Sequence, residues 1–199
     1  MMNKQYKFGK NNDWKEDFLY AYSLEAKTHT EFDVEEDCVV NRYNAEQKTN
    51  SFPYDYISMV TKKQYGPCVQ VKTQCSFEKF GAPLIVFSNE IVEKDGVHYY
   101  GAHFEVVAYE NGLNVWYIIP NNDINAQRRV KVTKIACIDF PVEANTRLDL
   151  EVTIKNKTIY ARMAGQELTV SHEKIPESFH IGITACEGVN RFYSFEIEK

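Results

Sequence analysis

The sequence predicts an all-β fold, a sandwich of two packed antiparallel sheets, and three observations support this prediction. Aromatic residues make up 14% of the 199 residues, with 13 Tyr and 12 Phe, which favours strands. From about residue 37 onward, the chain divides into short β-rich segments separated by Gly, Pro, Asn and Asp. These segments, roughly ten to thirteen in number, are too many for one flat sheet. A chain of 199 residues fits one large sandwich, so we expect a single domain spanning residues 1–199.

The clearest strand is expected at 148–154 (LDLEVTI), where apolar and polar residues alternate strictly. Turns at 155–157 and at Ala164-Gly165 then predict antiparallel partner strands at 158–163 and 167–171. The other strands that composition and punctuation predict are 56–61, 68–77, 84–88, 179–186 and 191–197. A chain organised in this way forms antiparallel hairpins and leaves little room for helix.

One short helix is expected near the N-terminus. Asp13 is suited to cap a helical segment over 13–23, in which Trp14, Phe18 and Tyr22 recur at fourfold spacing. This spacing places the three aromatic side chains on one helical face, where we expect them to belong to the core rather than to a ligand site.

Charge and hydropathy exclude two classes of partner. The formal net charge is −5, and Lys and Arg are scattered, so no basic stripe is available to contact phosphates and nucleic acid is not expected. No apolar segment approaches the length needed to span a bilayer, so no membrane interaction is expected either. The N-terminus MMNKQYKFGKNNDWK lacks the apolar region of an export signal, which predicts a cytoplasmic protein.

The five cysteines are expected to be free thiols. They are odd in number, lack CxxC spacing and occur without an export signal, all of which argue against a disulfide framework. Cys137 and Cys186 lie in apolar segments that resemble strands, where free thiols commonly pack in the interior. No P-loop, GxGxxG or GxSxG pattern is present, and we predict neither a cofactor nor a structural metal.

Residues 100–120, YGAHFEVVAYENGLNVWYIIP, contain the strongest hairpin signal of the chain. Asn111 and Gly112 tolerate the positive φ that a two-residue turn requires, and with these residues as the turn Glu105 is expected opposite Ile118. Alternation then assigns one face to the core: Ala102, Phe104, Val106, Ala108, Val115, Tyr117 and Ile119. The opposite face carries His103, Glu105, Val107, Tyr109, Asn114, Trp116 and Ile118.

This second face combines hydrogen-bonding groups with flat aromatic rings, which is what a sugar requires because it presents both hydroxyl edges and C–H faces. We predict a site for a carbohydrate or a sugar-containing small molecule. In this interpretation Trp116 and Tyr109 stack on sugar rings and Glu105 binds hydroxyls, with Glu187 and Arg191 closing one rim. The candidate ligand-binding residues are His103, Glu105, Tyr109, Asn114, Trp116 and Arg191. A solvated sheet face with cross-strand aromatic pairs is the alternative.

The strand meander and three segments resemble the concanavalin A-like lectin/glucanase superfamily. The segments are FGAPLIVFSNE at 80–90, YGAHFEVVAYENG at 100–112 and FHIGITACEGVNRFYSFEIEK at 179–199. The resemblance covers the chain from about residue 35 and points to a bacterial branch. It implies an antiparallel jelly-roll β-sandwich with a concave sheet that binds carbohydrate, and therefore that the face with Glu105 and Trp116 is concave.

Two features of this superfamily are missing or ambiguous. Laminarinase-type members carry two carboxylates on one strand in an ExDxxE pattern, whereas EVVAYE here places Glu105 and Glu110 on opposite faces. Legume-lectin-type members bind metal through a loop of Asp and Asn oxygens. The segment 121–125 (NNDIN) offers such oxygens to Ca²⁺, although an Asn-rich turn is the favoured interpretation.

Two other functions are kept as alternatives to a sugar-binding domain. The first is a glycoside hydrolase in which Glu105 and Glu187 are catalytic carboxylates on either side of a cleft. Against it, Glu187 can simply belong to a loop and pair with Arg191 at its neck. The second is a structural domain whose aromatic face forms a homodimer interface. A groove on this face favours ligand binding, and a flat apolar patch favours self-association.

Overall fold

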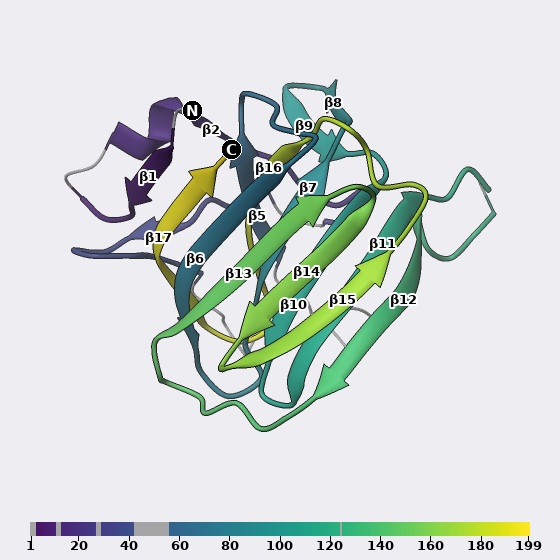
Figure 1. The fold of residues 1–199 in the computed structure, drawn as a ribbon. Coiled ribbons are helices and arrows are strands. Elements are labelled where there is room, and N and C mark those ends of the chain that lie inside the picture. Colours follow the sequence, from purple (N-terminus) through teal and green to yellow (C-terminus); the bar gives the residue numbers. More distant parts are fainter. Residues whose placement is uncertain (1–2, 11–12, 27–28, 42–55, 124) are drawn as a thin grey trace.

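The computed structural model describes residues 3–10, 13–26, 29–41, 56–123 and 125–199, and it shows the expected sandwich of two large antiparallel sheets (Figure 1). In spatial order, the eight-stranded sheet contains β15 (Gln166–Ser171), β14 (Thr158–Met163), β13 (Leu148–Lys155), β6 (Val69–Phe77), β17 (Asn190–Glu198), β4 (Val39–Val40) and β3 (Asp33–Val34), with β1 (Lys4–Lys7) also paired to β17. The seven-stranded sheet contains β12 (Val130–Asp139), β11 (Gly112–Pro120), β10 (His103–Tyr109), β7 (Ala82–Ser88), β16 (His180–Cys186), β5 (Tyr56–Thr61) and β2 (Phe18–Tyr20). A small hairpin of β8 (Ile91–Lys94) and β9 (Val97–Tyr100) lies beside them.

The main core fills the space between the two sheets. Phe87 on β7 stacks on Phe104 of β10 with a ring separation of 5.1 Å, and Phe179 lies at the same distance from Phe87. The eight-stranded sheet contributes buried aliphatic side chains such as Val71 and Val152, which pair across β6 and β13. Alternation along each strand, as expected from the 148–154 pattern, sends every second side chain into this layer.

The expected helix over 13–23 is wrong. The segment forms only a 3₁₀ turn, η1 (Asp13–Glu16), and Phe18 then enters β2 opposite Thr61 of β5. Sheet pairing satisfies the backbone of this segment, so the fourfold aromatic spacing does not impose a helix. Trp14, Phe18 and Tyr22 are nevertheless all buried, as predicted. Within the described residues, no helix combines the length and the apolar character that crossing a membrane requires.

The β10–β11 hairpin has a different register from the one expected. Tyr109 pairs with Gly112, so the two turn residues are Glu110 and Asn111, and Glu105 lies directly opposite Trp116 instead of Ile118. Gly112 is the position with positive φ (+131°), and a Cβ there would lie 2.1 Å from the Ile138 carbonyl oxygen of β12. The partner of each residue changes by two positions, which leaves every side chain on its predicted face.

A β-bulge in β12 reshapes the edge of the seven-stranded sheet. Val115 pairs with Ala136 but the next residue, Trp116, pairs with Lys134, so Ile135 is the extra residue. The bulge reverses the alternation of β12. As a result Asp139 on one side of the bulge and Lys134 on the other lie on the same face as Trp116.

The face of the seven-stranded sheet that points away from the main core, here called the outer face, is also partly covered. Ala21 and Val60 join Leu84, Val86 and Tyr100 in a second buried cluster on this face. The covering residues come from the N-terminal segment and from β9, which occupy the β5 and β7 side of the face. The part formed by β10, β11 and β12 is left to line a pocket.

All five cysteines are free in the structure. Cys38 and Cys75 are buried, whereas Cys68 and Cys137 are exposed. The expectation that Cys137 packs in the interior is therefore wrong, because it lies on the edge strand β12 and its side chain points outward.

Candidate functional site

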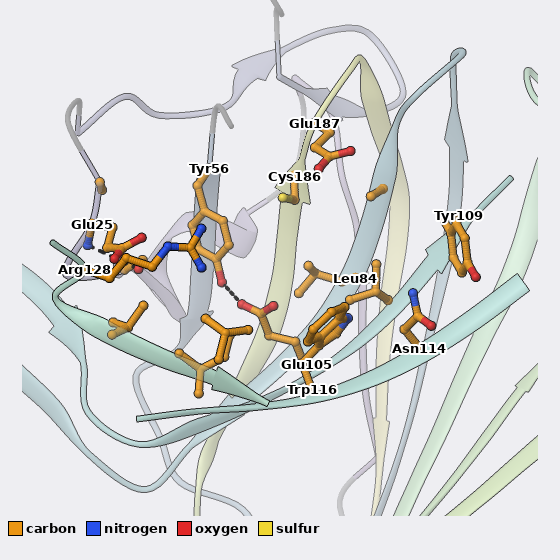
Figure 2. A pocket seen from close by; sticks show the side chains of 17 residues that line it. Glu25, Tyr56, Leu84, Glu105, Tyr109, Asn114, Trp116, Arg128, Cys186 and Glu187 are labelled. Atoms are coloured by element: carbon orange, nitrogen blue, oxygen red, sulfur yellow. Dashed lines mark hydrogen bonds between the residues drawn. The ribbon is translucent and has the colours of Figure 1, made fainter. Parts of the chain in front are cut away.

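A pocket of about 330 Å³ lies on the outer face of the seven-stranded sheet (Figure 2). Its floor comes from β7, β10 and β11, one side from β12, and the other from β5, β16 and the N-terminal segment. The lining residues are Ser23, Glu25, Ala26, Tyr56, Ala82, Leu84, Glu105, Val107, Tyr109, Asn114, Trp116, Ile118, Arg128, Val130, Val132, Cys186 and Glu187. The predicted chemical face of the hairpin is therefore the floor of a cavity and not a flat surface.

Glu105 is the central polar group of the pocket. The residue is only 6% exposed, although it stands on the outer face. The Tyr56 hydroxyl, from β5, donates a hydrogen bond to Glu105 Oε1 (Figure 2). Burial raises the pKa of Tyr56 well above its usual value, and the charge of Glu105 acts in the same direction. Tyr56 is therefore a neutral hydrogen-bond donor at neutral pH, and its hydroxyl fixes the position of Glu105 Oε1.

His103 lies behind Glu105 and does not line the pocket. It is 2% exposed, and its Nδ1 donates to the Gly101 carbonyl oxygen at 2.9 Å. Its Nε2 lies 3.5 Å from Glu105 Oε1. Tyr100 packs against the imidazole with ring centroids 4.8 Å apart. His103 therefore packs beside Glu105 and is not a group that touches a ligand in this pocket.

Trp116 and Asn114 stand two residues apart on β11 and face the same cavity. Trp116 is partly buried beside Glu105, and Lys134 Nζ lies 4.9 Å from its ring centroid. Asn114 is 7% exposed, and its Oδ1 has no hydrogen-bond partner. A buried amide oxygen without a partner is costly unless another molecule donates to it. The pocket thus combines a flat aromatic ring with an acceptor that a ligand hydroxyl can satisfy.

The two ends of the pocket carry different polar side chains. Tyr109 and Asn114 lie toward one end (Figure 2), and the Tyr109 hydroxyl donates to Asp139 Oδ1 at 3.2 Å. Glu25 and Arg128 lie toward the other end. Among the described lining residues, carboxylates outnumber cationic side chains, with Glu25, Glu105 and Glu187 against Arg128.

Cys186 is unsuited to nucleophilic chemistry. Burial raises the pKa of its thiol well above the usual value, and the charges of Glu105 and Glu187 add to this effect. Because the reactive species is the thiolate, a thiol kept protonated in this way is inert. Cys186 contributes apolar surface to the pocket wall.

The structure brings together most of the residues that the sequence predicted. Glu105, Tyr109, Asn114 and Trp116 line the pocket, and Glu187 lines it as well. Arg191 does not: it lies on β17 in the other sheet and pairs with Glu78 at 3.1 Å. The expected closure of the rim by Arg191 therefore has no counterpart in this geometry.

The Asn-rich segment after β11 is organised as a turn. The Asn121 Oδ1 accepts from the Asp123 backbone N–H at 3.3 Å, and Asp123 Oδ1 accepts from the Asn125 N–H at 2.9 Å. The side-chain oxygens thus satisfy the backbone of their own loop, as in Asx turns. Ile124 lies outside the described residues. In the part of the chain that the structure describes, no cluster of three or more His, Cys, Asp or Glu has an arrangement able to hold a metal.

Several lining residues could not be found from the sequence. Tyr56 occurs in a correctly predicted strand, but its position beside Glu105 depends on a sheet order that joins β5 to β7 through β16. Val130 and Val132 face the pocket because of the bulge in β12. Arg128 and Glu25 come from irregular segments without a motif. The only sequence signal for these groups was that Tyr56 begins an expected strand.

The Tyr56–Glu105 hydrogen bond generates a prediction about stability. Tyr56→Phe removes the donor and leaves a buried carboxylate with one partner fewer, which should lower the free energy of unfolding by about 1.5–3 kcal/mol. Urea denaturation at neutral pH measures this change. Tyr160→Phe is the matched control, because Tyr160 is exposed on the eight-stranded sheet and the same change there should cost less than about 0.5 kcal/mol. Equal stability of the two variants would contradict the assigned role.

No protein-family model and no curated protein sequence matches the chain. Solved structures do match it at low sequence identity. A glycoside hydrolase family 16 endo-glucanase from Bacteroides ovatus has 6% identity and a TM-score of 0.57, with 99% of each chain covered. The exoplasmic/lumenal domain of VIP36, in a Ca²⁺/Man-bound form, has 10% identity and a TM-score of 0.55, covering 91% of this chain and 82% of that one.

A third match is the carbohydrate-binding module CBM66 from Bacillus subtilis, with 11% identity, a TM-score of 0.52, and coverage of 70% of this chain and 78% of that one. At these identities the likeness establishes the fold alone. Together with the two antiparallel sheets described above, it shows that the chain has the jelly-roll β-sandwich fold of these structures.

Proposed function

We propose that the pocket on the outer face binds a carbohydrate. The observation that carries this proposal is the partnerless Asn114 Oδ1, buried in a cavity that also presents the Trp116 ring and the Glu105 carboxylate. A sugar hydroxyl can donate to Asn114 and to Glu105 while its C–H face packs on the indole. The fold shared with a carbohydrate-binding module and with a mannose-bound lumenal domain supports the same proposal.

The charges around the pocket favour a neutral sugar. Three carboxylates and one guanidinium belong to the lining residues, so an acidic polysaccharide would bring further negative charge toward a region that is already negative. The alginate lyase AlgAT5 shares the fold at 11% identity with a TM-score of 0.52. The charge of the pocket argues against an acidic ligand for this chain despite the shared fold.

A glycoside hydrolase is the second candidate function, and one observation favours it. Glu105 and Glu187 line the same pocket, although Glu105 lies on β10 and Glu187 lies in the loop that follows β16. Most glycoside hydrolases cleave the glycosidic bond with a pair of carboxylates that face one cavity. Self-association through the aromatic face receives less support, because that face is hollowed into a cavity and is not a flat patch.

The direct test of the proposal is a glycan array that contains neutral, amino and acidic oligosaccharides. The expected result is binding to one group of neutral glycans, with no binding to polyuronates, for the electrostatic reason given above. Any positive glycan is then tested for hydrolysis. Binding confined to acidic glycans would contradict the assigned charge preference, and a blank array would contradict carbohydrate binding.

Trp116→Ala should remove the flat surface on which a sugar ring packs. The expected loss of affinity is about 1–3 kcal/mol, measured by calorimetry with a glycan from the array. The fold should be retained, because Trp116 faces the pocket and not the main core. If the variant instead lost about as much stability as a core truncation, roughly 3–5 kcal/mol, Trp116 would be a core residue and the site assignment would fail.

Glu105→Gln separates the two candidate functions. Glutamine keeps the size of the side chain and an oxygen acceptor but removes the charge that general acid or base catalysis requires. In a binding domain the variant should keep measurable affinity for the glycan. In a hydrolase it should bind the glycan and lose nearly all turnover. A variant that turns over a hydrolysable glycan at the wild-type rate would exclude Glu105 as a catalytic carboxylate.

A further inference from the structure

Phe80 is an exposed aromatic residue next to the Glu187 end of the pocket. Its side chain is 58% exposed, the largest value among the exposed large hydrophobic residues of the described chain. Exposed aromatic rings beside a cavity are common contact surfaces for ligands. The surroundings of Phe80 indicate that its exposure is imposed by a specific turn.

Phe80 occupies a turn position that its residue type does not favour. The Gly81 backbone N–H donates to the Glu78 carbonyl oxygen at 2.8 Å, which closes a four-residue turn, and Phe80 at the third position has a φ of +68°. Gly or Asn normally fills such a position, because a side chain with a Cβ is strained there. Strain of this kind is commonly associated with a functional site.

The turn is firmly attached to the loop that carries Glu187. The Glu78 backbone N–H donates to the Val189 carbonyl oxygen at 2.9 Å, and the Glu78 carboxylate pairs with Arg191. The two loops also approach closely, since a Cβ on Gly188 would lie 2.8 Å from the Phe80 carbonyl carbon. Arg191, absent from the pocket, thus helps to hold the turn that presents Phe80.

Phe80 lies close to the part of β7 that lines the pocket. It precedes Ala82 by two residues, and Ala82 and Leu84 line the pocket whereas Ile85 belongs to the main core. A Cβ on Gly81 would point at Phe77 and Asn190, which lie in the interior. Together with the close approach of Gly188 to the Phe80 backbone, this places Phe80 next to the Glu187 end of the pocket.

We propose that Phe80 forms a second sugar-contacting surface beyond Glu187, so that the site takes an oligosaccharide and not a single sugar. This inference rests on the proposed function and adds the ligand length to it. Trp116 contacts one sugar unit on the pocket floor, and Phe80 packs against another unit outside the cavity. The strained backbone keeps the ring presented without a core to hold it.

Phe80→Asn tests this inference, because asparagine accepts the left-handed backbone and removes the ring. The probes are a length series, from the single sugar to long oligomers, of a glycan identified on the array. Calorimetry should show affinity for long oligomers falling about three- to tenfold, with affinity for the shortest probe unchanged. The melting temperature should stay the same or rise, since strain is relieved. If Phe80 only stabilised the fold, its replacement would lower the melting temperature.

Tyr160→Ala is the matched control, because Tyr160 is an exposed aromatic residue of the eight-stranded sheet, outside the pocket. It should change affinity for no probe. The inference is overturned if Phe80→Asn binds long oligomers as tightly as the wild type while Trp116→Ala weakens binding of every length. If the wild-type protein binds no glycan on the array, the proposed function fails and this inference fails with it.

Discussion

The alternation of side chains across the seven-stranded sheet, interrupted only at the described bulge in β12, is the constraint on which both the core and the pocket depend. Away from that bulge, each strand sends every second residue into the layer between the sheets, where Phe87 and Phe104 stack, and the remaining residues to the outer face. Once the apolar residues of a strand are placed in the core, the residues between them are fixed on the outer face. Glu105 and Trp116 reach the pocket because their neighbours Phe104 and Val115 are needed in the core.

Holding a carboxylate in this position requires hydrogen bonding, since an uncompensated buried charge is unfavourable. Tyr56 supplies a neutral donor from β5 to Glu105 Oε1, and the His103 imidazole lies 3.5 Å from the same oxygen. Tyr56 reaches Glu105 from β5 across β16 and β7. The hydrogen bond that makes burial of Glu105 tolerable also fixes its orientation, so the pocket presents an ordered acceptor and not a mobile side chain.

Much of this arrangement follows from local sequence. The strands 56–61 and 158–163 were predicted with the observed bounds, and the hairpin kept its two faces although Gly112 serves close packing against Ile138 instead of the turn. Features that depend on distant pairing were not accessible. The β12 bulge and the approach of Tyr56 to Glu105 can be found only when the sheet order is known. The fourfold spacing around Phe18 wrongly predicted a helix, because this segment pairs with β5 as a strand.

In the proposed complex, a sugar contacts the pocket floor at Trp116. The chain has two tryptophans, and Trp14 is buried with its indole N–H directed at the Gly9 carbonyl oxygen, on a part of the structure that does not line the pocket. The indole N–H signals in a ¹⁵N-resolved NMR titration with an array-positive glycan therefore report on the two environments separately. Contact between the sugar and Trp116 should move the Trp116 signal with saturating dependence on glycan concentration while the Trp14 signal stays in place. Glycan binding that leaves the Trp116 signal unchanged would contradict this contact.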